Sequence, residues 1–376
     1  MNYSGIYIHI PFCRNRCNYC DFYITTRTDL ADRYLKNLLT EIELTKDIYT
    51  DYIFDSVYIG GGTPSLLSSQ HISSLLTKIN ECFKIQKNSE ITLEVNPEDL
   101  LQQEDKIQEY AESGINRISF GLQSFCESDL IFLTRYSDTK KIEYILEKVL
   151  NHFKNTSVDI IYSIPGSGYG TLERTIEKII ELEIPHISGY TLIFEKNTSL
   201  YNLSEKKVIN KNSDILESEL YEKLTKKLTD SGYNHYEISN YAKSGYESVH
   251  NLKYWQYDNY LGLGASSHSF FYPKRWKNFS NIIKYNLSLE NKILPAEKTK
   301  ELSGEETEKE LIFLGLRSRG INLKKFSGIT GYKFEEKYSK EIEILCSNNF
   351  ALINPDYFRL TENGFRIADE IAAKYF

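Results

Sequence analysis

Three cysteines within eight residues form the most reactive group in the chain. They are Cys13, Cys17 and Cys20, spaced Cys-x3-Cys-x2-Cys, and they directly follow an apolar run at 5–11. Thiolates are soft ligands that suit zinc or an iron–sulfur cluster. Structural zinc usually takes four ligands, often as two pairs, but the other cysteines stand alone: Cys82, Cys126 and Cys346. The spacing therefore favours a cluster with one open iron, with zinc and simple packing as the alternatives.

Further polar groups stand where predicted strands end. A glycine run, Gly60-Gly61-Gly62-Thr63-Pro64, closes the second strand, and Glu94 lies at the end of the third. Three more polar residues are candidates for the same edge: Gln123 directly after the fourth strand, Arg135 twelve residues further on, and Asp159 in the fifth strand. In parallel α/β folds the carboxyl ends of the strands meet at one edge, where sites form. We expect these residues to share one site, although a tight turn, a helix-capping acid and surface ion pairs are the plainer explanations.

Strands and helices alternate through the first half of the chain. The strands are predicted at 5–11, 56–60, 90–95, 116–122, 158–164 and 186–194, and the helices at about 30–48, 65–83, 98–113, 138–152 and 171–183. This alternation predicts parallel strands joined by right-handed crossovers. Six units are too few for a closed eight-stranded barrel. The predicted fold is therefore α/β, with an open, partial (β/α)6 barrel.

The alternation stops near residue 195. Ser213 is a candidate cap for a helix to about 230, and an irregular aromatic region follows at 233–272. Beyond 300 the pattern is helical, with a hairpin at 351–361, which predicts a small winged-helix-like domain. With 11 Lys/Arg against 13 Asp/Glu in 301–376, we expect a structural or lid role and no DNA binding. The predicted divisions are 1–195, a barrel extension at 196–299, and 300–376.

Composition narrows the class of protein. The chain has 376 residues, 41% hydrophobic and 26% charged, which is typical of a globular protein. Its net charge of −7 argues against a nucleic-acid partner. No apolar run reaches the ~18 residues of a membrane span, and the start shows no secretory signal. We therefore expect a cytoplasmic protein with reduced thiols.

The cysteine spacing is that of the radical S-adenosylmethionine (SAM) family, which the chain resembles well beyond this motif. The resemblance implies a 4Fe–4S cluster on Cys13, Cys17 and Cys20, a partial six-stranded barrel, and SAM bound at the open iron. Segments such as GGGTP, LEVNP, NRISFGLQSF and DIIYSIPG resemble the oxygen-independent coproporphyrinogen III oxidase group. By position, this group's SAM-contacting residues correspond to Tyr7, Gly61, Gly62, Thr63, Glu94, Gln123, Arg135 and Asp159.

Two features resemble the haem-chaperone sub-branch of that group. The oxidases carry a fourth cysteine two residues after the third, where this chain has Phe22. The segment His250-Asn-Leu-Lys-Tyr254-Trp255 matches the sub-branch's His-Asn-x-x-Tyr-Trp haem motif. The resemblance thus implies haem contact by these three residues and iron ligation by His250, since neutral imidazole is a good haem ligand. Nearby basic residues are candidates for the haem propionates: Lys253, Lys274, Arg275 and Lys277.

The predicted function is that of a haem chaperone of radical SAM fold, with three cofactors: a 4Fe–4S cluster, SAM and haem. It would deliver haem to a recipient haem protein, such as a respiratory enzyme, and use a reducing electron donor. The resemblance also allows transient membrane association and a homodimer. The alternative is a true coproporphyrinogen III oxidase, which decarboxylates propionates by radical chemistry. Ser137 and Ser163 depart from the group's usual pattern, so SAM turnover is left open and no catalytic residue is assigned.

Overall fold

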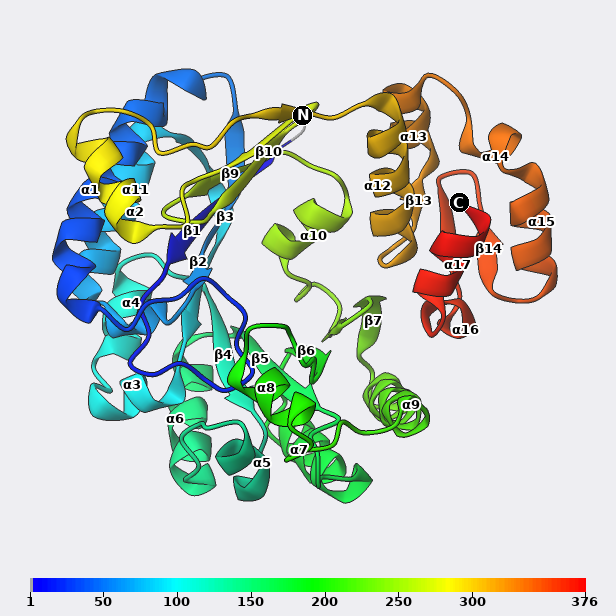
Figure 1. Ribbon diagram of the computed structural model, residues 1–376, viewed down its shortest axis with the longest axis horizontal. Helices are drawn as coiled ribbons and strands as arrows, with labels where there is room; N and C mark the ends of the chain where they lie inside the picture. The colour runs from blue at the N-terminus through cyan, green and yellow to red at the C-terminus, as the bar shows by residue number, and fades with distance from the viewer. Residues whose placement is uncertain (1–2) are drawn as a thin grey trace.

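The computed structural model describes residues 3–376, and its main feature is a sheet whose central strands follow chain order. These parallel strands are β1 (Ser4–Ile10), β2 (Ile53–Gly61), β3 (Lys84–Val95), β4 (Arg117–Gln123), β5 (Asn155–Tyr162) and β6 (His186–Thr191). The helices between them are α1 (Ala31–Thr45), α2 (Ser69–Cys82), α3 (Pro97–Gln102), α4 (Lys106–Glu112), α5 (Glu127–Phe132), α6 (Thr139–His152) and α7 (Tyr169–Glu181). The predicted partial (β/α)6 barrel is confirmed (Figure 1).

The predicted helix at 98–113 is wrong as a single element. It is two helices, α3 and α4, with a break after Gln102. Short 3-10 turns also flank the other helices: η1 (Thr28–Leu30), η2 (Lys46–Ile48) and η3 (Pro64–Leu66). Pro97 begins α3 and Asn96 caps it by accepting a hydrogen bond from the Glu98 N–H. This start holds the end of β3 and the acids that follow it in place.

Short strands extend the sheet on both sides. On one side β9 (Tyr260–Leu263) runs parallel to β1, followed by β10 (His268–Phe271), β11 (Lys274–Lys277) and β12 (Lys300–Glu301). On the other side β8 (Asn240–Ala242) pairs antiparallel with β6, and β7 (Asn234–Glu237) lies outside it. The sequence pattern predicts none of these strands, because they are two to four residues long and form by pairing with an existing edge.

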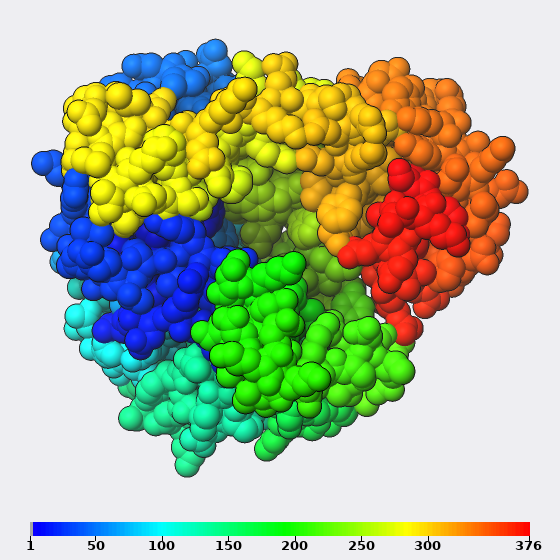
Figure 2. All heavy atoms as spheres, in the orientation of Figure 1, coloured from blue at the N-terminus to red at the C-terminus, as the bar shows by residue number. Residues whose placement is uncertain are grey.

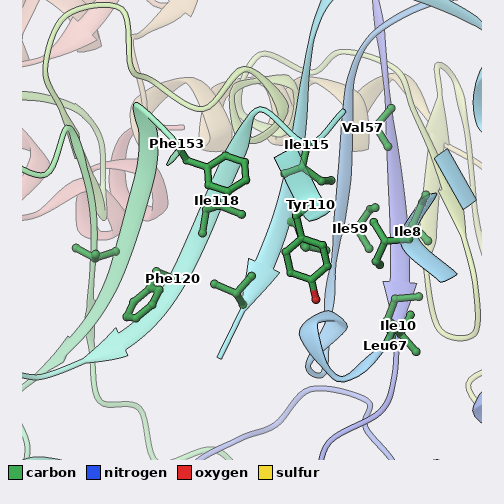
Figure 3. Packing of buried hydrophobic residues seen from close by; sticks show 14 of the residues in the cluster. Ile8, Ile10, Val57, Ile59, Leu67, Tyr110, Ile115, Ile118, Phe120 and Phe153 are labelled. Carbon is green, nitrogen blue, oxygen red and sulfur yellow. The ribbon is translucent and has the colours of Figure 1, made fainter. Parts of the chain in front are cut away.

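The core lies between the barrel strands and the helices that cover them. Alternate residues of the strands point outward into this layer, as Figure 3 shows for Ile8 and Ile10 of β1 and for Ile118 and Phe120 of β4. From α7, Ile176 and Ile179 are fully buried. Complete burial of such a side chain stabilises the fold by about 1.5–3 kcal/mol. The strand residues between these outward ones point toward the inside of the barrel, where polar side chains can form a site.

The C-terminal segment is the predicted winged-helix-like unit. Its helices are α12 (Gly304–Leu316), α13 (Leu323–Thr330), α14 (Phe334–Lys337), α15 (Ser339–Ser347), α16 (Glu362–Phe365) and α17 (Ala368–Tyr375). Its small antiparallel sheet has the order β13 (Ile321–Asn322), β15 (Tyr357–Leu360), β14 (Ala351–Ile353). Its apolar core also contains Tyr257 and Phe270 from outside the segment. The predicted boundaries at 195 and 299 stay predictions.

The middle of the chain supplies the remaining helices. They are α8 (Ser199–Glu205), α9 (Asp214–Asp230), α10 (Val249–Trp255) and α11 (Ile282–Glu290). The predicted cap of α9 is confirmed, since the Ser213 hydroxyl accepts a hydrogen bond from the Leu216 N–H at 3.2 Å. Helix α10 contacts β1 and β2 on one side and α12 on the other (Figure 1). It therefore lies between the barrel and the C-terminal segment. No helix in residues 3–376 combines the length and the apolar character that crossing a bilayer requires.

Candidate functional site

The three cysteines lie in the loop that follows β1. The loop is fixed to the strand's extension by backbone bonds from Thr25 N to Pro11 O (2.7 Å) and from Cys13 N to Thr25 O (3.0 Å). All three thiols are partly exposed and free of disulfides. The Thr63 hydroxyl donates to Cys13 Sγ at 3.3 Å, and Arg135 Nη1 donates to Cys17 Sγ at 3.6 Å. Donors of this kind stabilise thiolates, which are the metal-binding form of cysteine.

The cysteine loop does not form a ready-made site for a single metal ion. Within residues 3–376 no three Cys, His, Asp or Glu side chains converge on one point as ligands of one metal ion, the three cysteines included. A zinc site would require such convergence, with Zn–S distances near 2.3 Å. In an iron–sulfur cubane each thiolate binds a different iron, so the sulfurs stand further apart. Burial raises the pKa of Cys13 to about 11, and a bound cationic iron would favour its thiolate.

The glycine run places Thr63 beside the cysteine loop. Gly61 has a φ of +115°, and a Cβ there would come within 2.5 Å of the His9 ring. Only glycine fits this close approach. The backbone then continues alongside β1, with bonds from Gly62 N to Ile10 O (2.8 Å) and from Thr63 N to Phe12 O (2.7 Å). The turn thus carries the Thr63 hydroxyl to Cys13.

The carboxyl ends of the strands surround a cavity of about 520 Å³. All three cysteines line it, as do seven of the predicted SAM residues: Gly61, Gly62, Thr63, Glu94, Gln123, Arg135 and Asp159. Tyr7 is not among the lining residues. Its ring stacks on Tyr58 at 6.1 Å between centroids, and its hydroxyl bonds His9 Nδ1 at 2.9 Å. Tyr7 therefore supports the wall behind Tyr58. We call this space the cluster cavity.

Strands β3 and β5 place two carboxyl groups, Glu94 and Asp159, in the wall of the cluster cavity. Burial, reinforced by the charge of Asp159, raises the pKa of Glu94 to about 7. Burial also raises the pKa of Asp159 to about 6, against hydrogen bonds that lower it. Tyr58 Oη and Gly61 N donate to Glu94 at 2.8 and 3.0 Å. A cationic ligand would stabilise both carboxylates, so this wall is suited to a group such as an ammonium or sulfonium.

Arg135 is one of four arginines that line the cluster cavity, with Arg14, Arg16 and Arg117. Its Nη2 donates to the Gly121 carbonyl at 3.0 Å while Nη1 reaches Cys17. The thiol of Cys17 and the neighbouring Tyr19 favour the charged guanidinium and raise the pKa of Arg135, against burial. Arg135 is thus held with one side toward the cysteine loop.

Several polar wall residues escaped our sequence analysis. They alternate with outward apolar residues along β2, β4, β5 and β6: Tyr58, Ser119, Ser157, Ser188 and Tyr190. The two-residue period of a strand places them on the face that carries Glu94 and Asp159. This period, applied to each predicted strand, would have found them. Deeper in the barrel, His186 bonds the Ser157 hydroxyl at 2.6 Å and the Tyr236 hydroxyl at 2.7 Å. The strand period alone does not show that these side chains meet, because Tyr236 lies outside the six barrel strands.

The predicted haem motif forms α10, and its side chains face different ways. His250 is buried, with Nδ1 bonded to the Ser56 hydroxyl at 3.0 Å and Nε2 to the Tyr254 hydroxyl at 2.9 Å. Burial, together with the charge of Lys253, lowers the pKa of His250 to about 3, so the ring is neutral. Trp255, in contrast, lines a second cavity on the side of the C-terminal segment. Iron ligation by His250 requires release of one of its two hydrogen bonds.

Three of the four basic residues proposed for propionates already have acidic partners. Lys253 is buried and pairs with Asp55 at 2.6 Å, and Arg275 forms a two-pronged pair with Glu310 at 2.7 and 2.9 Å. Lys277 is 3.8 Å from Glu297. The fourth, Lys274, is exposed at the start of β11. Lys253 in particular is a poor candidate, because freeing it would leave the Asp55 charge without its partner.

Comparison with known proteins agrees with this geometry. Residues 7–179 match the Radical SAM superfamily, and residues 302–367 match the HemN C-terminal domain. The chain is 33% identical to the heme chaperone HemW of Lactococcus lactis subsp. lactis, over 99% of this chain and 97% of that protein. It is 35% identical to the heme chaperone HemW of Bacillus subtilis, over 90% of this chain and 88% of that protein.

A solved structure shows the same fold. It is the coproporphyrinogen III oxidase HemN from Escherichia coli, a radical SAM enzyme, with a TM-score of 0.82 over 99% of this chain and 89% of that one. The identity is 19%, so this likeness concerns the fold alone. The curated relatives, at 30–35% over most of the chain, support the chaperone over the oxidase.

Proposed function

This chain belongs to the HemW family of radical SAM proteins, and from that membership we propose that it binds haem and delivers it to a recipient haem protein. The observation that carries the proposal is the similarity to curated heme chaperones along 99% of the chain. That length includes the cysteine loop, α10 and the C-terminal segment. The proposed recipient is a respiratory haem protein, and we place this exchange in the cytoplasm.

Membership of the radical SAM superfamily implies a 4Fe–4S cluster and SAM. We propose that Cys13, Cys17 and Cys20 hold the cluster, which supplies an iron with an open coordination position when bound. Thr63 and Arg135 hold the thiolates by hydrogen bonds. Glu94 and Asp159 offer negative charge to the cationic part of SAM, and Gly61 admits a ligand close to the backbone. The predicted SAM contact of Tyr7 acts through its stack on Tyr58.

For haem, we propose contact by Trp255 and Tyr254 and iron ligation by His250. The ring of His250 is neutral, which is the form that binds iron. Its Nε2 becomes free when the Tyr254 hydroxyl, one helical turn further on, turns away. We propose that the formed hydrogen bond keeps the histidine closed and that breaking it opens the ring to iron. A reducing electron donor, transient membrane association and a homodimer complete the proposal.

The proposal is tested by titrating the anaerobically reconstituted protein with haem while the Soret band is followed. We expect saturation near one haem per chain, and weaker binding with an altered spectrum for His250→Gln. The matched control is His152→Gln, because His152 is exposed at the end of α6 and its loss should change nothing. Non-saturating binding, or equal binding by all three proteins, would remove His250 from the site.

A second assay separates the chaperone from the oxidase. The reconstituted protein is incubated anaerobically with coproporphyrinogen III, SAM and a reductant, and products are separated by chromatography. We expect no protoporphyrinogen, but transfer of bound haem to an apo-haem protein such as apomyoglobin. Formation of protoporphyrinogen over many turnovers would instead assign the oxidase activity.

A further inference from the structure

A second cavity lies between the barrel and the C-terminal segment. It has a volume of about 650 Å³, within the ~300–1,000 Å³ range of small-molecule sites. One wall is a face of α10 and the residue after it, with Val249, Leu252, Lys253 and Gln256 spaced at helical intervals. The other wall comes from α12, β13 and α13. Figure 2 shows a hollow between the barrel and the orange C-terminal segment, with the yellow-green colour of this region at its floor. We call the cavity the interdomain cavity.

Helix α10 separates the two cavities. Ser248 and Asn251 line the cluster cavity, whereas Leu252 and Lys253 line the interdomain cavity. The helix is anchored at its start by Glu90, which accepts hydrogen bonds from Val249 N at 3.1 Å and His250 N at 3.0 Å. The same short helix is therefore a wall of both sites.

The interdomain cavity combines flat apolar surfaces with positive charge. Aromatic side chains among its lining residues are Tyr3, Trp255, Tyr257, Phe326 and Tyr357. Its charged lining residues are four cations and two acids: Lys253, Arg319, Lys324, Lys325, Asp55 and Asp258. This excess of positive charge stands out in a chain with a net charge of −7. Such a lining suits a flat, largely apolar molecule that carries carboxylates.

Of the four cations, one is unpaired and one is only partly engaged by an acid. Lys253 pairs with Asp55 at 2.6 Å and Lys325 with Asp258 at 2.5 Å, so both are neutralised. Lys324 is exposed and has no ion-pair partner in the described part of the chain. The side chain of Arg319 is 44% exposed, and only one of its nitrogens lies near an acid, at 3.2 Å from Glu247. Arg319 and Lys324 can therefore meet anionic groups from the solvent side.

The backbone fixes the position of Arg319. It lies in the turn between α12 and β13, where Gly320 has a φ of +118° and a Cβ would come within 2.7 Å of the Phe358 carbonyl. The turn is held to the barrel extension by a bond from Ile238 N to Arg317 O at 2.9 Å. The guanidinium thus projects from a rigid support, which lowers the entropic cost of binding a carboxylate.

We propose that the interdomain cavity binds a tetrapyrrole dicarboxylate, with the macrocycle against Trp255 and the carboxylates at Arg319 and Lys324, before His250 ligates the iron. This inference rests on the proposed function, since it names where haem is held. Among the described residues that line the cavity there is no histidine or cysteine, and His250 lies on the other face of α10. Binding here consequently requires no iron.

The test uses iron-free protoporphyrin IX, followed by its fluorescence on titration with the protein. The double variant Arg319→Glu, Lys324→Glu should raise the Kd about tenfold or more, because two attractions become repulsions. His250→Gln should leave this Kd within about twofold. The matched control is Lys340→Glu, an exposed lysine on α15 outside the cavity, which should also change nothing. Protoporphyrin IX dimethyl ester, which lacks the carboxylates, should bind weakly and equally to all four proteins.

The outcomes separate this inference from the proposed function. If protoporphyrin IX does not bind the wild-type protein, or binds the double variant equally well, the inference is overturned. If haem still saturates the protein and His250→Gln still weakens it, the chaperone function stands without this cavity. If neither haem nor protoporphyrin IX saturates the wild-type protein, both proposals fail.

Discussion

Replacing Glu94 by Gln removes one negative charge from the cluster cavity and keeps the shape of the side chain. Burial and the neighbouring Asp159 raise the pKa of Glu94 from 4.5 to about 7. An acid with a higher pKa in the folded state stabilises the fold below its unfolded pKa of 4.5, and this contribution is lost as the pH rises through about 7. At pH 8 the folded protein therefore carries the full cost of the ionised carboxylate.

The free-energy cost of the ionised carboxylate follows from the pKa of Glu94 in the folded and in the unfolded protein. Their difference corresponds to about 3 kcal/mol at 1.36 kcal/mol per pH unit. Glu94 borders the cluster cavity, where water screens its charge, so about 1–2 kcal/mol is the expected effect. In the metal-free protein, Glu94→Gln should raise the free energy of unfolding by this amount at pH 8 and by almost nothing at pH 4.5.

Urea unfolding, followed by circular dichroism at both pH values, measures this difference. The matched control is Glu147→Gln, since Glu147 is exposed on α6 and should give the same unfolding free energy as the wild type at each pH. A Glu94→Gln protein that is less stable than the wild type at pH 8 would refute the reasoning. It would show that Tyr58 and Gly61 compensate the charge fully through their hydrogen bonds.

Four further substitutions test other parts of the structure. Cys17→Ser should lose bound iron and acid-labile sulfide after reconstitution while the circular dichroism spectrum is kept; full retention of iron would contradict the cluster assignment. Arg135→Gln removes the donor to Cys17 and should speed the loss of iron to a chelator several-fold, whereas an unchanged rate would show that the contact is dispensable. Tyr254→Phe frees Nε2 of His250 but keeps the aromatic ring that we propose contacts haem, so it should strengthen haem binding with a sharper Soret band; weaker binding would mean that the tyrosine hydroxyl itself is needed for haem binding. Leu224→Ala empties a buried position of α9 and should cost about 2–5 kcal/mol in urea unfolding, and a cost below about 1 kcal/mol would show that the site collapses.

The spacing of apolar residues along the chain predicted much of the fold. Apolar runs of five to nine residues predicted the six barrel strands. The helical spacing of Leu172, Ile176, Ile179 and Ile180 predicted the helix at about 171–183 and its buried face, and of these four only Ile180 is half-buried. These patterns are read correctly because each element buries one face against the same layer. The short strands β7 to β12 were missed. Their two to four residues carry too little pattern, and they pair only because the barrel offers an open edge.

The cysteine spacing and the glycine run are also patterns of neighbouring residues, and from the sequence alone they were predicted to form the centre of a site. Their partners came from the tertiary structure. Arg135 reaches Cys17 from 118 positions away, and Glu90 caps α10 from 160 positions away at His250.

The haem motif shows most clearly what the sequence alone does not determine. Its six residues indicated contact with haem, but not that His250 is enclosed while Trp255 faces the interdomain cavity. Which way a helix turns its residues depends on the surfaces packed against it. For α10 those surfaces are β1, β2 and α12, strands from the start of the chain and a helix near its end, which only folding brings together.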